Sequence, residues 1–121
     1  MNQDLDNSMT KKIDYRKLVL QHSRSRTIAY NPDLAKLLNS VKAGLLLGHL
    51  LFWWGKGRNP NYIYKTLAEM EAELGLSDKE QNAAVKKCVV AGFLKTFKKG
   101  IPAKRHFIVY PDAITTALKA L

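Results

Sequence analysis

The chain has 121 residues, of which 46% are hydrophobic and 25% are charged. This length supports one compact core and is too short for two ordinary domains, and the apolar content excludes wholesale disorder. Lys and Arg number 20 against 10 Asp and Glu, which gives a formal net charge of +10. We therefore expect an anionic partner, with nucleic acid first and an acidic protein or an anionic membrane surface second.

The sequence carries no sign of export or of membrane insertion. Its N-terminus is polar, so no signal peptide is predicted. The main apolar run, Ala43 to Trp54, has about 12 residues, whereas a bilayer-spanning helix needs roughly 20. The lone cysteine, Cys88, excludes an intramolecular disulfide and is expected to be a small core residue in a reducing compartment. We expect a cytoplasmic protein without membrane contact.

Residues 1–26 are predicted to form a flexible tail with a short N-terminal helix and a basic arm. Met1–Ser8 shows no pattern and is expected to be frayed. Thr10 can cap a short helix with one apolar strip, which packs either across the domain's own core or against a second subunit. This strip consists of Ile13, Lys17 and Leu18, with Tyr15 and Val19 beside it.

The arm after this helix is basic and contains Arg24 and Arg26. It either lies along phosphates or in a minor groove of DNA, or it is a solvated linker. Residues 27–121 are expected to form a single domain. Thr27–Tyr30 alternate weakly and are predicted to be a short strand, after which Asn31 caps a helix that ends near Leu38.

A strongly hydrophobic helix is predicted to open at Ser40 and to form the centre of the core. Almost no polar face remains among its leucines. It ends at Trp53 and Trp54, which are interpreted as core residues, with base stacking and self-association as the alternatives. The histidine inside this helix, His49, is expected to be a hydrogen-bonded core residue.

Two capped helices and a short turn follow a glycine-rich loop over residues 55–61. Tyr62–Lys65 are predicted to form an edge strand that leads into the first helix. Each helix begins with a capping box, in which a hydroxyl side chain and a glutamate three residues later bond each other's backbone N–H groups. These pairs are Thr66 with Glu69 and Ser77 with Glu80, and the helices end at Gly75 and Gly92.

The second of these helices is expected to turn an apolar stripe inward, made by Val85, Cys88 and Val89. Residues 93–99 and 104–110 then read as two strands of a hairpin with a turn between them. The hairpin contains basic residues and no acidic residue, which favours a polyanionic partner. A closing helix is predicted from Asp112, with Ile114, Ala117, Leu118 and Leu121 on its apolar side.

From Leu76-Ser77 to Gly92-Phe93-Leu94 the chain resembles the winged helix-turn-helix superfamily. The preceding segments, Asn31-Pro32-Asp33 and the helix ending in Phe52-Trp53-Trp54, look like replication-associated or regulatory DNA-binding proteins of phages and plasmids. The resemblance implies an α+β, mainly helical fold with a two- to three-stranded β-wing and flanking N- and C-terminal helices. It also implies location in the bacterial cytoplasm or nucleoid.

In such a fold the second helix, residues 78–91, enters the major groove, and the wing, residues 93–110, contacts the backbone. Gln81 occupies a position that is usually aliphatic in the superfamily, and it is either half-buried or reaches a base. His106, beside Arg105, either touches phosphate or is solvated. The candidate base contacts are Lys79, Gln81, Asn82 and Lys86. The candidate backbone contacts are Lys98, Lys99, Lys104 and Arg105 in the wing, and Arg24 and Arg26 in the arm.

No catalytic pattern is present in the sequence, because the three histidines are scattered and Cys88 has no partner at a metal-ligand spacing. We therefore expect no enzymatic activity, no cofactor and no metal. The leading hypothesis is double-stranded DNA binding as a homodimer, in a transcriptional regulator or a replication-associated protein of a mobile element. The alternatives are a winged helix used for protein interaction or oligomerisation, and single-strand or RNA binding through Tyr62, Tyr64 and the tryptophans.

Overall fold

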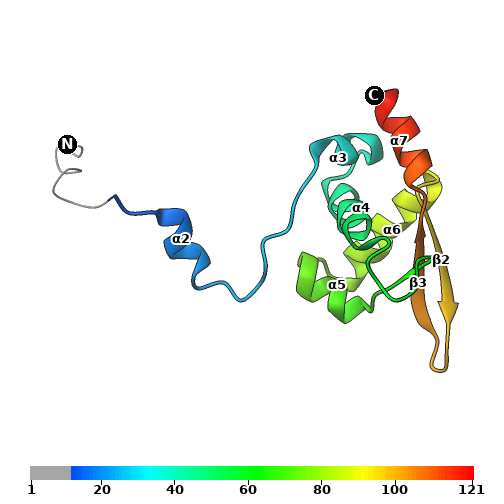
Figure 1. Cartoon of the computed structure of the whole chain (residues 1–121), viewed down its shortest axis with the longest axis horizontal. Coiled ribbons are helices and arrows are strands. Elements are labelled where there is room, and N and C mark those ends of the chain that lie inside the picture. The colour runs from blue at the N-terminus through cyan, green and yellow to red at the C-terminus, as the bar shows by residue number, and fades with distance from the viewer. Residues whose placement is uncertain (1–11) are drawn as a thin grey trace.

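The computed structural model describes residues 12–121 and has an α+β architecture, as expected (Figure 1). The predicted tail Met1–Ser8 and the predicted cap Thr10 lie outside these residues. None of the helices between residues 12 and 121 is long and apolar enough to cross a membrane. In chain order the elements are α2 (Tyr15–Leu20), α3 (Pro32–Leu38), α4 (Val41–Trp53), β1 (Ile63–Tyr64), α5 (Leu67–Leu74), α6 (Asp78–Val90), β2 (Leu94–Lys99), β3 (Lys104–Val109) and α7 (Pro111–Lys119).

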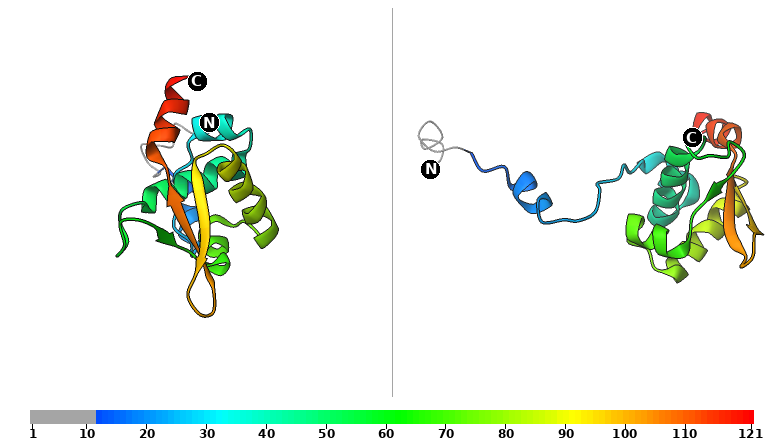
Figure 2. Two further views of the ribbon diagram at one scale, coloured as in Figure 1. Left: turned by 90° about the vertical axis from the view of Figure 1, so that its right-hand side faces the viewer. Right: turned by 60° about the horizontal axis from the view of Figure 1, so that its bottom comes forward.

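Helix α2 lies apart from the other elements, at the end of an extended segment (Figures 1 and 2). It begins after Asp14, whose side chain accepts a hydrogen bond of 3.0 Å from the backbone N–H of Lys17. Within the described residues no α2 side chain is buried, so the prediction that this helix packs across the domain's own core is wrong. The contact with a second subunit stays a prediction.

The predicted strand Thr27–Tyr30 is also wrong, because these residues are extended without strand pairing. A strand needs a partner, and the three-stranded sheet is formed by β1, β3 and β2 without this segment. The next two helices begin as predicted. Asn31 accepts a hydrogen bond from the N–H of Asp33, and Ser40 accepts one from the N–H of Ala43.

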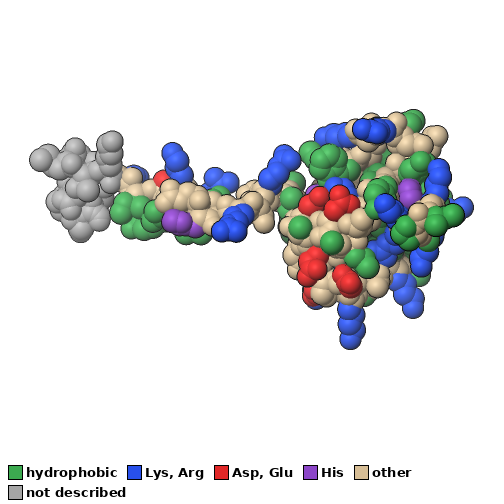
Figure 3. Space-filling view, turned by 90° about the horizontal axis from the view of Figure 1, so that it is seen from below, with side chains coloured by type: hydrophobic (Ala, Val, Ile, Leu, Met, Phe, Trp, Pro, Cys, Tyr) green, Lys and Arg blue, Asp and Glu red, His purple; other side chains and the backbone are tan. Residues whose placement is uncertain are grey.

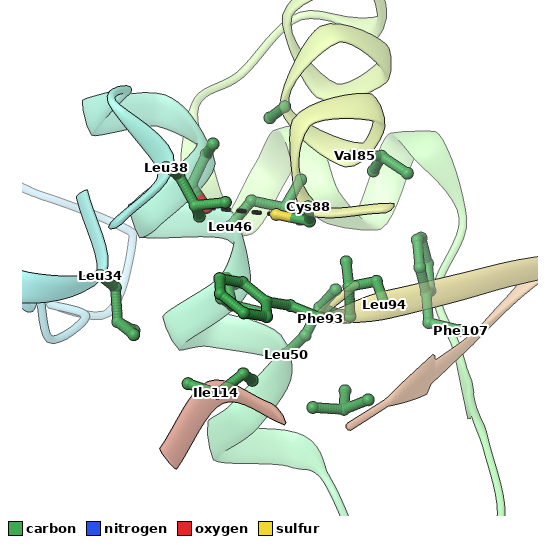
Figure 4. Packing of buried hydrophobic residues seen from close by; sticks show 14 of the residues in the cluster. Leu34, Leu38, Leu46, Leu50, Val85, Cys88, Phe93, Leu94, Phe107 and Ile114 are labelled. Carbon is green, nitrogen blue, oxygen red and sulfur yellow. Dashed lines mark hydrogen bonds between the residues drawn. The ribbon is translucent and has the colours of Figure 1, made fainter. Parts of the chain in front are cut away.

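Helix α4 is the centre of the core, as predicted, and Leu46, Leu47 and Leu50 are fully buried (Figure 4). Helix α3 packs against it at close range because Gly44 has no side chain. A Cβ on Gly44 would lie 2.6 Å from the Cα and N atoms of Ala35, a distance that no relaxed structure allows. Gly44 therefore sets the separation of α3 and α4.

Helices α5 and α6 have the two predicted capping boxes, with both reciprocal hydrogen bonds in each. Gly75 ends α5 in the left-handed conformation, at φ = 73°. The buried stripe of α6 differs from the predicted one, because Val89 is 40% exposed while Gln81 is fully buried. The observed stripe follows the spacing i, i+3, i+4, i+7, which Gln81, Ala84, Val85 and Cys88 occupy.

The sheet is antiparallel, with strand order β1-β3-β2, so β1 is the edge strand that the sequence predicted. The inner face of the sheet, which includes Phe107 and Val109, packs on the helices. Helix α7 closes the domain through Ile114, which is buried. Leu121 is 61% exposed, so its predicted place on the apolar side is wrong.

The close approach at Gly44 predicts opposite effects for the same substitution at two positions of α4. Gly44→Ala forces α3 and α4 apart and is expected to lower the free energy of unfolding by about 2 kcal/mol. Gly48→Ala meets only the Cδ1 of Leu34, at 3.5 Å, and is expected to raise it by up to about 1 kcal/mol through helix propensity. Urea denaturation measures both. If both substitutions stabilised the fold, the close contact between Gly44 of α4 and Ala35 of α3 would be contradicted.

Candidate nucleic-acid interface

Helix α6 presents three of its four candidate base-contact residues to solvent. Lys79, Asn82 and Lys86 are exposed and follow one side of the helix. The capping box at Ser77 fixes the start of α6 one turn before Asn82, so these side chains belong to the N-terminal half and middle of the helix. This is the part of a recognition helix that reaches base edges in a major groove.

Gln81 is placed differently from the prediction that it contacts a base. Its side chain is fully buried, and its Nε2 donates hydrogen bonds of 2.9 Å to the carbonyl of Leu67 and 3.0 Å to the carbonyl of Leu76. These carbonyls belong to the start of α5 and to the turn before α6. The side chain therefore holds the two helices together and cannot reach a base without leaving the core.

Arg105 of β3 is bound to α6 and does not extend freely from the hairpin. Its Nη1 donates a hydrogen bond of 2.9 Å to the Oδ1 of Asn82, and its guanidinium lies 5.1 Å from the ring centre of Phe107. Burial lowers the pKa of Arg105, and the charge of Asp78 opposes this shift. Arginine nevertheless keeps its charge at neutral pH. The contact joins the hairpin to α6 at the residue predicted to read a base.

The register of the hairpin divides the four wing candidates between two faces. Lys98 is directly opposite Arg105, so both side chains point to the α6 side. Lys99 is opposite Lys104, and this pair points to the outer face. There the Nζ of Lys99 donates to the hydroxyl of Tyr62 at 3.2 Å, and Lys104 lies 5.3 Å from the ring centre of Tyr64. The sequence did not distinguish these two faces of the hairpin.

The charges of the domain are segregated. Residues 81–111 contain seven Lys and Arg residues and no Asp or Glu, and in the part of the chain that the structure describes none of the seven forms an ion pair. Three acidic residues, Glu69, Glu71 and Glu73, belong to α5, and Figure 3 shows acidic side chains gathered on one part of the domain surface. Asp78, at the start of α6, is close enough to Arg105 to act on its pKa. Two of the acidic residues already have partners: Glu80 pairs with Lys42, and Glu73 pairs with Lys65 and His49.

These ion pairs change the pKa values of the two glutamates. The bond with Lys42 and the capping bonds with Ser77 lower the pKa of Glu80 to about 2. Burial alone would raise the pKa of Glu73, but the hydrogen bonds and charges of His49 and Lys65 together lower it. Both carboxylates are therefore ionised at neutral pH and belong to the scaffold. His49 is a hydrogen-bonded core residue, as predicted, with 2.6 Å between its Nε2 and Glu73 Oε1.

The structure does not bring Arg24 and Arg26 to α6 or to the hairpin. Both line a cavity of about 530 Å³ whose other walls come from α4 and α5, including Phe52 and Trp53. Trp53 and Trp54 are half-buried and pack against the core, in agreement with their interpretation as core residues. Contacts of the two arginines with phosphate stay a prediction.

Sequence reasoning missed an aromatic cluster on the outer face of the sheet. His106 was expected to touch phosphate or to be solvated on an outer strand, but β3 is the central strand, and His106 is only 8% exposed. Tyr64 and Phe97 flank it on the neighbouring strands. The alternation of side chains along each strand could have indicated a shared face, but only if the register were known.

Cys88 is a core residue, as predicted. Its thiol is buried against α4, with the Sγ 3.8 Å from the carbonyl oxygen of Ala43, and burial raises its pKa to about 12. A thiol with this pKa is a poor nucleophile and a poor metal ligand at neutral pH. Among residues 12–121 no group of three His, Cys, Asp or Glu side chains is arranged to hold a metal ion.

The position of Gln81 predicts that its replacement destabilises the fold. Gln81→Ala leaves a cavity and removes the hydrogen bonds to the carbonyls of Leu67 and Leu76, and we expect the free energy of unfolding to fall by about 3 kcal/mol. Lys79→Ala, an exposed position two residues earlier on α6, is the control and should change it by less than about 0.5 kcal/mol. Denaturant unfolding followed by circular dichroism measures both. Equal stabilities of the two variants would contradict the structural role.

Comparison of the chain with protein-family models, with curated proteins and with solved structures found no match. The function is therefore inferred from geometry and charge alone. The structure has a helix, α6, with exposed polar residues, and the β2–β3 hairpin is hydrogen-bonded to it. The positive charges of these elements have no acidic neighbours between positions 81 and 111. Such a surface can bind a polyanion.

Proposed function

We propose that this protein is a non-enzymatic, winged helix-turn-helix binder of double-stranded DNA. The element order supports the winged-helix assignment, because α5, a three-residue turn, α6 and the β2–β3 hairpin follow one another. The binding surface, named the duplex face below, consists of Lys79, Asn82, Lys86, Lys98 and Arg105. The protein acts as a dimer, in the role of a transcriptional regulator or of a replication-associated protein of a mobile element.

The observation that carries this proposal is the hydrogen bond between Arg105 and Asn82. It makes α6 and the inner side of the hairpin one continuous surface, so a duplex that contacts one element meets the other. The absence of acidic residues from positions 81 to 111 supports the same proposal, because no carboxylate in this segment repels phosphate.

On a duplex, α6 lies in the major groove, which is wide enough for one helix. Asn82 pairs with an adenine, and Lys79 and Lys86 meet guanine or phosphate. In the free protein the Oδ1 of Asn82 is occupied by Arg105, so bidentate binding of adenine requires Arg105 to turn toward a phosphate. Base recognition by Asn82 and phosphate contact by Arg105 are therefore coupled, because Arg105 must leave Asn82 before either can form.

The duplex face predicts a strong, salt-dependent effect of two lysines. The double variant Lys86→Ala with Lys98→Ala removes one cation from α6 and one from the inner side of the hairpin. We expect at least about a tenfold loss of affinity for duplex DNA at low salt, and a reduction of about 2 in the slope of log affinity against log salt. Fluorescence anisotropy with a labelled random-sequence duplex measures both quantities.

The control is Lys36→Ala with Lys119→Ala, which removes the same charge from α3 and α7, far from the hairpin tip (Figure 1). Its affinity and slope should stay close to those of the unmodified chain. Absence of duplex binding by the unmodified chain at low salt would rule out the proposal. Equal losses in the two double variants would show that net charge, not the duplex face, drives binding.

A second candidate function is self-association through α2. The observation that favours it is the exposure of its apolar side chains, since a helix of six residues is not stable in water without a packing partner. Tyr15, Leu18 and Val19 form one side of this helix. We propose a second copy of the chain as the partner that covers them.

This candidate predicts that charged substitutions in α2 dissociate a dimer. We expect Leu18→Asp with Val19→Asp to be monomeric by light scattering at a concentration where the unmodified chain is dimeric. Val90→Asp, at an exposed valine of α6, is the control and should remain dimeric. A monomeric unmodified chain, or a dimer that survives both α2 substitutions, would exclude this role for α2.

A further inference from the structure

The outer face of the sheet carries a row of aromatic rings that crosses all three strands. Tyr64, His106 and Phe97 are neighbours in register, and the ring of His106 stacks between the other two. The ring centres of His106 are 5.1 Å from Tyr64 and 5.2 Å from Phe97, with interplanar angles of 30° and 22°. Tyr62 packs edge-on against His106, at 5.0 Å. In the left view of Figure 2 the sheet faces the viewer, and none of the described helices covers it.

Hydrogen bonding fixes the orientation of the central ring. The Nδ1 of His106 donates to the backbone carbonyl of Lys104 at 2.9 Å, because a carbonyl oxygen can only accept. The aromatic row is therefore organised before any ligand binds. Stacked rings at a protein surface lower the entropic cost of binding a further flat ring, since they do not need to be ordered on contact.

Positive charge borders this row. The Nζ of Lys99 lies 4.9 Å from the ring centre of Tyr62, and the Nζ of Lys104 lies 5.3 Å from that of Tyr64. None of the three strands contains an acidic residue. The combination fits a ligand that alternates flat rings with negative charges.

A hollow of about 400 Å³ opens next to the row, between β1 and the loop that precedes it. Its aromatic lining consists of Trp53, Tyr62, Tyr64 and His106, and the loop contributes Arg58 and Asn59. The volume is within the range of small-ligand pockets and is sufficient for one nucleobase. Asn59 offers its side-chain NH2 group to a base edge, since its Oδ1 accepts a hydrogen bond of 2.8 Å from the N–H of Asn61, and Arg58 offers a cation for a phosphate.

We propose that this outer face binds single-stranded DNA, with one unpaired base in the hollow against Tyr64 and the adjoining phosphates at Arg58 and Lys104. Aromatic stacking together with cations along the backbone is how proteins hold single strands without reading their sequence. An acidic protein would use the lysines but would leave the aromatic row unexplained. The choice of DNA over RNA rests on the proposed duplex function, whereas the stacking site itself does not.

This site lies on the opposite side of the hairpin from Lys98 and Arg105, so both surfaces can be occupied at once. A duplex on the inner side and an unpaired strand on the outer side would place the β2–β3 hairpin at a junction between them. The proposal thus adds a preference for partly opened DNA to the proposed duplex binding.

The test measures anisotropy of the full chain with a labelled oligothymidylate of about 12 nucleotides, and separately with the labelled duplex. Tyr64→Leu removes the ring but keeps an apolar side chain beside His106, and we expect about tenfold weaker binding of the single strand with unchanged duplex affinity. Tyr64→Phe keeps the stacking and should bind the single strand as the unmodified chain does. The Lys86→Ala, Lys98→Ala variant should show the converse loss, with the larger effect on the duplex.

Tyr110→Leu is the matched control, because Tyr110 is 39% exposed and Tyr64 is 37% exposed, but Tyr110 lies outside the aromatic row. Thermal unfolding of each variant separates loss of fold from loss of binding. A second experiment needs no substitution. Cross-linking of the unmodified chain to an oligonucleotide that carries photoreactive 5-iodouracil should label Tyr62, Tyr64 or His106.

The proposal is overturned by single-strand affinity that Tyr64→Leu leaves unchanged, by cross-links confined to other residues, or by tighter binding of oligouridylate RNA. Loss of duplex binding alone would overturn only the proposed duplex function.

Discussion

The orientation of α6 depends on the buried side-chain amide of Gln81. Its Nε2 bonds the carbonyl of Leu67 at the start of α5 and that of Leu76 in the turn, so one side chain connects both helices and the segment between them. An aliphatic residue here would fill the space but would remove both hydrogen bonds, including the buried one to the carbonyl of Leu76 in the turn. Asn82 follows immediately and points outward because Gln81 points inward. The exposed residues of α6 therefore take their direction from a hydrogen bond in the core.

The hairpin continues this arrangement outward. Arg105 bonds Asn82 on the inner side, and the next residue, His106, points to the outer side and anchors the aromatic row. Adjacent residues of one strand thus serve two surfaces, as the pleat of a strand requires. The proposed duplex face and the proposed single-strand site share β3 as their common support, which is why substitutions for testing them are chosen on opposite sides of it.

The acidic and the basic residues have different places in the fold. Acidic residues near α5 are used in capping boxes and in the Lys65–Glu73–His49 contact, where they stabilise the scaffold. From position 81 to 111 the positive charges have no acidic neighbours in sequence, and the fold displays them on two faces of one hairpin. Such an arrangement attracts a polyanion over a distance of about one Debye length, roughly 10 Å at moderate salt.

Features that depend on residues close together in the chain could be predicted from the sequence. Both capping boxes, the glycine at the end of α5, the core helix after Ser40 and the basic hairpin were predictable, because each depends on contacts within a few positions. Tertiary structure decided the burial of Gln81, the exposure of α2, the Arg105–Asn82 bond and the aromatic row. The contacts of Gln81 with Leu67, of Arg105 with Asn82 and of His106 with Tyr64 depend on the helix crossing and the strand register, which bring together residues 14, 23 and 42 positions apart and leave no periodic pattern in the sequence. Gln81 shows the difference most clearly, since its polar side chain predicted either a half-buried position or a base contact, and only the fold places the carbonyls of Leu67 and Leu76 beside it.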